Sequence, residues 1–279
     1  MKDFSDFLVV SDIDGTLNNQ FRKTPKVNTE AINRFVHQLN GNFTLASARG
    51  VESLYIHYRN LPEVTTPAIV LNGAGIYDFT KKEMLWFNPV PESAYEVIEK
   101  GMKKFKSLEI GILTDDMIYL VRSRCMGKVM MMLDSLTHKT CKTLGEVPKG
   151  SWGKIIFFCL PNLKKKIKDY VVSLSGDDLA YIDTGSMSFD MVNSTTHKGN
   201  AVLKLAEILG VPENNIGAIG DYYNDLDMLK TVAHPACCEQ APQDIHSVCE
   251  YHACHCNNGA VADFLQYIEK NYSKKGEEV

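Results

Sequence analysis

The chain has 279 residues, of which 44% are hydrophobic and 23% are charged, and its formal net charge is −4. These values are ordinary for a globular protein, and the length suits one large domain or two smaller ones. The slightly negative charge argues against a nucleic-acid-binding surface, and no apolar run approaches the ~18 residues of a membrane-spanning helix. The acidic opening segment lacks the pattern of a signal peptide, so we expect a cytoplasmic protein whose eight cysteines are reduced.

A short stretch near the start joins an apolar strand to two acids. Residues 7–10 are apolar, which is typical of a strand buried on both faces of a parallel sheet, and Asp12 and Asp14 follow them. Unpaired buried carboxylates are costly, so we expect both acids at the carboxyl end of the strand, where a cation such as Mg²⁺ would neutralise them. Asp12 can then act as a nucleophile toward phosphorus, with Asp14 as general acid and base. The plainer alternative is a strand followed by an acidic turn.

The pattern then alternates between helices and strands. A helix is expected after residue 25 with Asn28 as its N-cap, and strands are expected over 42–47 and 67–71. Strand, helix and strand in alternation are the signature of a parallel sheet with crossover helices.

From about residue 82 the pattern changes. The segment 82–190 combines a hairpin over 108–121 with lysine-rich helices and further strands, which is typical of an α+β domain. The parallel pattern then resumes with a helix capped by Thr195 or Thr196. We therefore predict an α/β fold, with a Rossmann-like parallel-sheet core over 1–81 and 191–279 and a second, α+β domain inserted over 82–190.

Several chemical groups fall at the ends of the predicted core strands. They are Asp12 with Asp14, Ser47, Lys198, Asp221, Asn224 and Asp225. Ser47 can donate a hydrogen bond to a phosphoryl oxygen, Lys198 can balance charge, and Asp221 can complete a metal site. Asn224 and Asp225 can reach the phosphate or orient metal ligands. This inventory suits phosphoryl transfer, in which stabilisation of charge developing on oxygen is usually the largest catalytic contribution.

With these motifs in this order, the chain resembles phosphatases of the haloacid dehalogenase superfamily, in particular the Cof-type sugar-phosphatase branch. The matching segments are 12–17, 46–49, 72–74, 198–199 and 220–225. The resemblance covers both ends of the chain. It implies a Rossmann-like core with a large inserted α/β cap, Mg²⁺ as cofactor and a small phosphorylated metabolite as substrate.

The resemblance also implies roles for single residues. Mg²⁺ would be held by Asp12, the backbone carbonyl of Asp14, and Asp221, with Asp225 supporting these ligands. The substrate- and phosphate-binding set that it implies is Asp12, Gly15, Thr16, Ser47, Ala48, Arg49, Asn72, Lys198 and Asn224. Catalytic roles fall to Asp12, Asp14, Ser47 and Lys198. Many relatives have Thr-Gly-Arg where this chain has Ser47, Ala48 and Arg49, and the hydroxyl group survives this departure.

Cysteines crowd the C-terminal part of the chain. The residues concerned are Cys237, Cys238, Cys249, Cys254, His255 and Cys256. A zinc site is one interpretation, but the spacing contains no pair of Cys-x-x-Cys motifs. Cysteine also often packs as a small buried hydrophobe, which is the alternative.

The residues and the resemblance together predict a Mg²⁺-dependent phosphatase that hydrolyses a small phosphorylated metabolite, such as a sugar phosphate, through an aspartyl-phosphate. A phosphotransferase or phosphomutase on the same core is an alternative, and so is a catalytically idle binding or regulatory protein. We expect no nucleic-acid or membrane partner, and the sequence is silent on the oligomeric state.

Overall fold

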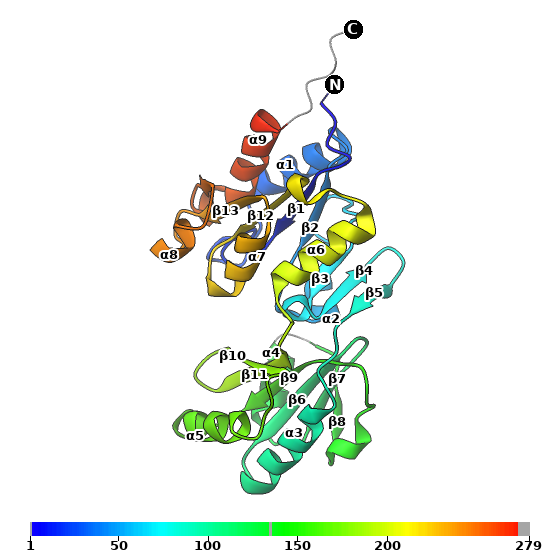
Figure 1. Cartoon of the computed structure of the whole chain (residues 1–279), viewed down its shortest axis with the longest axis vertical. Coiled ribbons are helices and arrows are strands. Elements are labelled where there is room, and N and C mark those ends of the chain that lie inside the picture. The colour runs from blue at the N-terminus through cyan, green and yellow to red at the C-terminus, as the bar shows by residue number, and fades with distance from the viewer. Residues whose placement is uncertain (1, 134–135, 273–279) are drawn as a thin grey trace. The chain divides into compact units, whose positions relative to one another are not determined.

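The computed structural model describes residues 2–133 and 136–272 (Figure 1). By its contacts the chain divides into two compact units. The first unit comprises Met1–Ala48, Leu54–Leu85 and His197–Val279, and the second comprises Arg49–Ser53 and Trp86–Thr196. No helix in the part of the chain that the structure describes is long and apolar enough to cross a membrane.

The first unit is built on a five-stranded parallel sheet with the strand order β14-β13-β12-β1-β2. Its strands are β1 (Leu8–Ser11), β2 (Asn42–Leu45), β12 (Ile216–Gly220), β13 (His234–Cys238) and β14 (Tyr251–Ala253). Every residue of β1 is buried, and the strand pairs in parallel with β2 and with β12. Because β1 is covered on both faces, its sequence is an apolar run rather than an alternation. The predicted α/β fold with a parallel-sheet core is confirmed.

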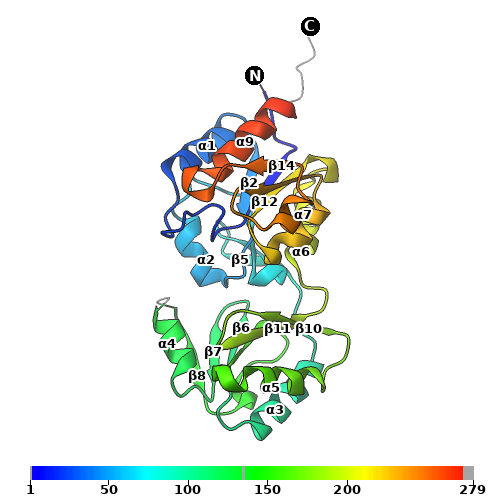
Figure 2. The same cartoon turned by 90° about the vertical axis from the view of Figure 1, so that its left-hand side faces the viewer.

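Helices cover both faces of this sheet (Figure 2). One face carries α1 (Lys26–His37) and α9 (Ala260–Asn271), and the other carries α6 (Lys198–Leu209) and α7 (Leu226–Thr231). The remaining helices around the sheet are α2 (Val51–Tyr58) and the short α8 (Gln243–His246). Short 3-10 helices of the first unit are η1 (Leu71–Gly73), η3 (Glu213–Asn215), η4 (Tyr223–Asp225) and η5 (Cys256–Asn258), whereas η2 (Leu144–Glu146) belongs to the second unit.

A small antiparallel sheet adjoins β2. It has the order β3-β4-β5 and consists of β3 (Ala68–Val70), β4 (Gly75–Asp78) and β5 (Glu83–Phe87). An isolated parallel bridge between Ala46 and Ile69 joins β3 to the main sheet. The turn η1 between β3 and β4 presses against the start of α6, because a Cβ atom on Gly73 would lie 2.4 Å from the His197 carbonyl oxygen. Only glycine fits there, and its φ of +99° also favours glycine.

Two predicted helix caps are wrong. Helix α1 begins at Lys26 after Pro25, whereas the buried Asn28 side chain donates to the Leu17 carbonyl at 2.9 Å and accepts from the Ala262 amide at 2.9 Å. The cap of α6 is His197, whose Nδ1 accepts from the Asn200 amide at 3.2 Å, rather than Thr195 or Thr196. For Asn28, the local sequence pattern predicts a cap, but its side chain instead bonds to backbone groups that are distant in the sequence.

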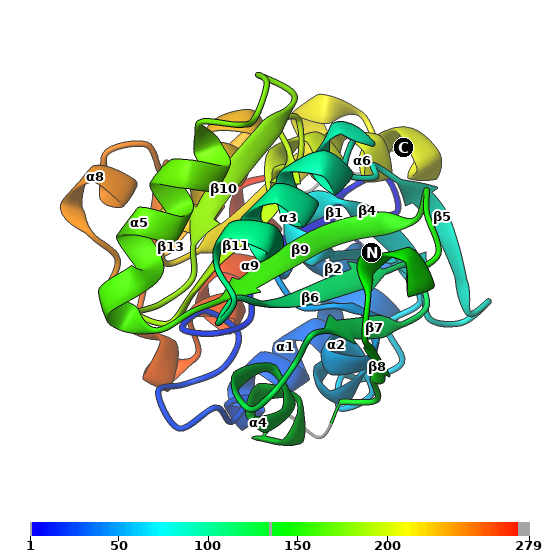
Figure 3. The ribbon, with the colours of Figure 1, turned by 90° about the horizontal axis from the view of Figure 1, so that it is seen from below.

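The second unit has its own six-stranded sheet with the order β10-β11-β9-β6-β7-β8. The strands are β6 (Glu109–Thr114), β7 (Ile118–Val121), β8 (Lys139–Cys141), β9 (Trp152–Phe158), β10 (Leu179–Asp183) and β11 (Ser188–Asn193). Helices α3 (Ser93–Lys104) and α5 (Pro161–Val172) lie across one face of this sheet (Figure 3), and α4 (Met126–Leu133) contacts β6. An apolar core fills the space between the sheet and α3 and α5; Ile110, Phe157 and Phe189 belong to it.

The hairpin predicted over 108–121 is present as the antiparallel pair β6 and β7. Among the described residues, no strand of the six-stranded sheet pairs with β1. At the proposed domain boundaries, β5 pairs with β4, and β11 continues to Asn193. That residues 82–190 fold as an inserted domain stays a prediction.

Candidate active site

The central strands of the first unit end in acids. Asp12 follows β1 directly, and its backbone amide donates a hydrogen bond to the Ile219 carbonyl at 3.0 Å. This bond extends the pairing of β1 with β12 by one residue. Asp221 follows β12, and Asp225 lies at the end of η4. Because the two strands are parallel neighbours, their carboxyl ends bring these acids to one edge of the sheet. Open α/β sheets bind their ligands at such an edge.

A buried ammonium group holds two of the acids together. Lys198 is the first residue of α6, and its side chain is only 1% exposed. Its Nζ donates to Asp12 Oδ1 at 2.5 Å and to Asp225 Oδ1 at 2.6 Å. Burial disfavours the charged amine, but Asp12 and Asp225 outweigh this effect and hold the pKa of Lys198 above its usual value. Lys198 is therefore a fixed positive charge between two carboxylates.

Lys198 does not compensate the whole negative charge of this cluster. Ligand oxygens of Asp12, Asp221 and Asp225 all lie within 4.8 Å of one another. Burial, and then repulsion by Asp225, raises the pKa of Asp12, and Lys198 opposes this rise only in part. The same two causes raise the pKa of Asp221 to about 6. Three clustered carboxylates with one ammonium group are short of positive charge, so the donor set fits a hard divalent cation.

Asp225 is committed to holding this cluster in place. It is fully buried, and its Oδ1 accepts from Lys198. Its Oδ2 accepts from the backbone amides of Asp221 at 3.1 Å and Tyr222 at 3.4 Å. Asp225 thus fixes both the ammonium group and the loop that carries Asp221, and its predicted role in supporting metal ligands stays a prediction.

The loop after Asp12 is fastened at two points. Gly15 has a φ of +90°, and a Cβ atom there would lie 2.2 Å from Asp221 Oδ2, so only glycine fits. The hydroxyl of the buried Thr16 donates to Asp221 Oδ1 at 3.5 Å. From another loop, Gln240 Nε2 donates to the Gly15 carbonyl at 2.6 Å. Asp14 immediately precedes these two contacts and lies at an exposed position.

Two further predicted residues are joined through their backbones. Ser47 follows β2 and is buried, and its carbonyl accepts from the Asn72 amide at 2.9 Å. Asn72 has a φ of +60°, which is uncommon for a residue other than glycine. Its Nδ2 is buried and has no hydrogen-bond partner within residues 2–133 and 136–272. An orphaned buried donor costs about 1–3 kcal/mol, and together with backbone strain it is typical of a ligand-binding position.

The roles predicted for all of the site residues stay predictions, and three of these residues lie outside the contacts described above. Asn224 is exposed in η4, close in sequence to the acid cluster. Ala48 is half-buried next to Ser47. Arg49 belongs by its contacts to the second unit, where its Nη1 donates to Ser53 Oγ at 3.1 Å.

The sequence motifs did not reveal Gln240. Besides holding the Gly15 carbonyl, its Oε1 accepts from the Cys256 amide at 3.2 Å. Gln240 lies in the loop between β13 and α8, and no local pattern distinguishes it from a solvated side chain. Only the fold brings Gln240 to the loop after Asp12, which precedes it by more than two hundred residues.

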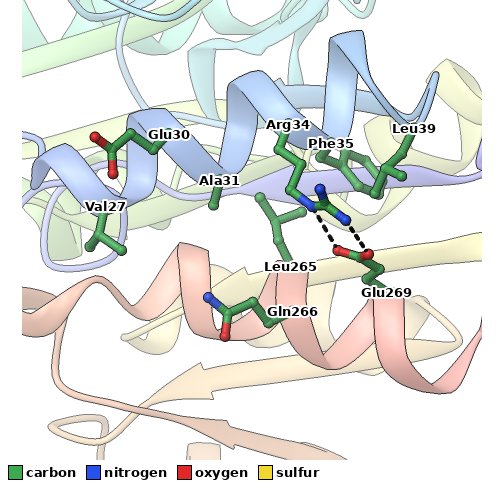
Figure 4. Close-up of a pocket in the computed structure, with 9 residues that line it drawn as sticks. All are labelled: Val27, Glu30, Ala31, Arg34, Phe35, Leu39, Leu265, Gln266 and Glu269. Carbon is green, nitrogen blue, oxygen red and sulfur yellow. Dashed lines mark hydrogen bonds and ion pairs between the residues drawn. The ribbon is translucent and has the colours of Figure 1, made fainter.

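A separate hollow of about 360 Å³ lies between α1 and α9 (Figure 4). Apolar side chains such as Phe35 and Leu265 line it, and Arg34 spans it with hydrogen bonds to Glu269 at 2.6 and 3.2 Å. None of its lining residues belongs to the acid cluster, so this hollow is a groove of helix packing rather than part of the chemistry.

Comparison with known proteins points to one family. A model of the haloacid dehalogenase-like hydrolases matches residues 9–265. A protein of Buchnera aphidicola subsp. Baizongia pistaciae that carries a provisional phosphatase name is 26% identical over 239 residues, which are 80% of this chain and 82% of that protein.

Solved structures share the fold. A protein from Thermotoga maritima superposes with a TM-score of 0.84 at 20% identity, covering 94% of this chain and 97% of that one. A sugar phosphatase of haloacid dehalogenase subclass IIB superposes with a TM-score of 0.75 at 16% identity, covering 94% of this chain and 99% of that one. At these identities the structures bear on the fold alone.

Proposed function

The chain belongs to the haloacid dehalogenase-like hydrolases, in their Cof-type branch. From this premise we propose that it is a Mg²⁺-dependent phosphatase, which hydrolyses a small sugar phosphate through an aspartyl-phosphate formed at Asp12. The class of the enzyme, a phosphoric monoester hydrolase, follows from the family and from its phosphatase-named relatives. One observation carries the finer proposal: the buried Lys198 is held between Asp12 and Asp225, with Asp221 beside them. For the substrate we propose a sugar phosphate by analogy with the subclass IIB sugar phosphatase that shares the fold.

The residues that would hold Mg²⁺ are Asp12, Asp221 and the backbone carbonyl of Asp14. When bound, the ion supplies positive charge that the cluster lacks and shields the oxygens of the phosphoryl group. Asp225 keeps its contacts to Lys198 and to the Asp221 loop and orients these ligands.

The chain's own residues then carry the reaction in two steps. Lys198 engages Oδ1 of Asp12, which leaves Oδ2 to attack phosphorus. As the bond from phosphorus to the leaving oxygen breaks, Asp14 gives that oxygen a proton. In the second step Asp14 takes a proton from a water molecule, the water oxygen bonds to phosphorus, and the bond to Asp12 breaks. Inorganic phosphate leaves, and both acids regain their starting states.

Donors around the cluster would hold the phosphoryl oxygens in both steps. The hydroxyl of Ser47, Nδ2 of Asn72 and Nζ of Lys198 supply hydrogen bonds or charge. For Asn72 the motivation is its orphaned Nδ2. In our proposal residues 82–190 form a cap domain that excludes bulk water while the phosphoenzyme forms.

Metal removal tests the proposal. We expect dialysis against EDTA to abolish hydrolysis of p-nitrophenyl phosphate and Mg²⁺ alone to restore it, because the acid cluster then regains its missing charge. A panel of phosphorylated metabolites, assayed by phosphate release, would identify the substrate. Full activity in metal-free buffer would contradict the metal dependence. Phosphate found on an added alcohol acceptor instead of in solution would indicate a phosphotransferase.

A second prediction concerns Gln240. Replacing it by Ala removes the hydrogen bond to the Gly15 carbonyl, which fastens the loop between Asp14 and Thr16. A hydrogen bond is worth about 0.5–1.5 kcal/mol, so we expect kcat to fall about two- to tenfold with little change in melting temperature. Gln266→Ala, an exposed change on α9, is the matched control. Unchanged kinetics in Gln240→Ala would mean that this contact does not position the loop.

A further inference from the structure

A second group of ligating side chains lies at the far edge of the first unit's sheet. Cys237, His246 and His252 each offer a ligand atom, and these atoms all lie within 4.8 Å of one another. Cys237 Sγ is 3.4 Å from Nδ1 of His246. Thiolate sulfur and imidazole nitrogen are the donors that Zn²⁺ prefers, whereas Mg²⁺ prefers oxygen. The chemistry of this group therefore differs from that of the acid cluster.

Regular backbone structure holds these side chains in place. Cys237 on β13 and His252 on β14 are partners in the parallel ladder. His246 is the last residue of α8, which connects the two strands. Cys237 is buried, His246 is half-buried and His252 is exposed, so the group opens from the apolar interior toward solvent. An ion thus has an entry path, and ligands on a strand, a helix and a second strand are positioned without a flexible loop.

Carbonyl groups orient both imidazole rings. Nε2 of His246 is 3.2 Å from the Glu239 carbonyl oxygen, which directs Nδ1 toward Cys237. Nε2 of His252 is 3.1 Å from the His246 carbonyl oxygen. The two rings meet edge to face, with their centroids 4.6 Å apart. Histidines that bind metals almost always donate their second ring nitrogen to such an oxygen, which fixes the tautomer.

A second cysteine packs beside Cys237. Cys237 and Cys249 belong to one small apolar cluster with Leu229 and Ile245, which covers the buried side of the group. The three ligand atoms of the group therefore come from Cys237, His246 and His252. One cysteine and two histidines supply three of the four ligands of a tetrahedral zinc ion.

We propose that Cys237, His246 and His252 form a zinc site that fastens α8 to the edge formed by β13 and β14. Three protein donors leave the fourth position of a tetrahedral ion to a water molecule, which the exposed side of the group admits. It shares no residue with Asp12, Asp221 and Asp225. The proposal does not depend on the proposed phosphatase activity.

The test uses the full chain without a histidine tag. We expect the purified protein to retain stoichiometric zinc through dialysis in chelator-free buffer, as measured by mass spectrometry of the metal. After replacement by Co²⁺, we expect the visible bands of a tetrahedral ion together with a thiolate-to-cobalt charge-transfer band. Zinc should also raise the melting temperature, because it binds the folded chain in preference to the unfolded one.

Variants make the test specific. His252→Gln changes an exposed side chain, so it should fold while losing retained zinc and the zinc-dependent rise in melting temperature. Cys237→Ser should lose retained zinc and the charge-transfer band. Cys254→Ser is the matched control, and it should keep both signals, as should Asp12→Asn. Absence of the thiolate band in the wild type, or equal zinc retention by wild type and His252→Gln, would overturn the proposal. Zinc lost only in Asp12→Asn would place the ion at the acid cluster and overturn it as well.

Discussion

Replacing Asp12 by Asn is expected to abolish turnover and to leave the fold intact. Asn keeps the shape of the side chain and its place at the end of β1, but it loses the charge that makes the carboxylate a nucleophile. Removal of a covalent nucleophile can cost on the order of 10⁶-fold in kcat. Lys198 keeps its ion pair with Asp225, and one of three mutually repelling carboxylates disappears. We therefore expect the melting temperature of Asp12→Asn to equal or exceed that of the wild type.

Steady-state hydrolysis of p-nitrophenyl phosphate and a thermal melt, taken on the same preparation, check both parts of this expectation. Asp177→Asn makes the same chemical change at an exposed position of the second unit and should leave activity and stability unchanged. Wild-type turnover in Asp12→Asn would exclude the covalent mechanism. A marked drop in melting temperature would mean that Asp12 mainly balances Lys198, and the loss of activity would then say nothing about a nucleophile.

Much of the core fold could be predicted because a strand that is buried on both faces has a recognisable local sequence, an unbroken run of apolar residues. The strand that ends at Asp12 is an unbroken apolar run, and the alternation of such strands with amphipathic helices predicts a parallel sheet. The order of the motifs then predicts which acids meet, since neighbouring parallel strands end at one edge. The structure brings Asp12, Lys198, Asp221 and Asp225 together there.

Contacts between segments that are distant in the sequence could not be predicted, because they have no local sequence pattern. Asn28 has the residue type of a helix cap, but its side chain serves the Leu17 carbonyl and the Ala262 amide. Gln240 holds the Gly15 carbonyl from a loop of the C-terminal part. In both cases the partner is a backbone group, which any residue could supply, so pattern and spacing cannot identify it.

The cysteine and histidine group illustrates the same limit. Spacing rules look for Cys-x-x-Cys pairs, whereas the two histidines of this group, His246 and His252, lie in a segment with no such pair. The cysteine that completes the group is Cys237, and it meets His252 only through the register of β13 and β14. Register across a parallel ladder depends on the crossover helix between the strands, which single-sequence patterns do not specify.

Asp14→Asn should separate the two steps of the mechanism. Asp14 gives a proton to the leaving oxygen in the first step and takes one from water in the second. A sugar alkoxide is a poor leaving group and needs that proton, whereas p-nitrophenolate is a good leaving group and needs it much less. The variant should therefore form the phosphoenzyme more slowly with a sugar phosphate than with p-nitrophenyl phosphate. Hydrolysis of the phosphoenzyme should slow equally for both substrates, because water activation is common to them. General acid–base help is worth ~10²–10⁴-fold, so the difference is measurable.

Rapid-quench kinetics with both substrates would measure this difference. With p-nitrophenyl phosphate, Asp14→Asn should accumulate phosphoenzyme and release p-nitrophenolate in a burst, because the second step becomes slower than the first. Gln240→Ala is the matched comparison, since it loosens the same loop through the Gly15 carbonyl and leaves the Asp14 carboxylate in place. A variant that only disturbs loop geometry should slow the first step by a similar factor for both leaving groups. If Asp14→Asn behaved in that way, Asp14 would hold the loop or the metal ligands, and another group would have to supply the proton.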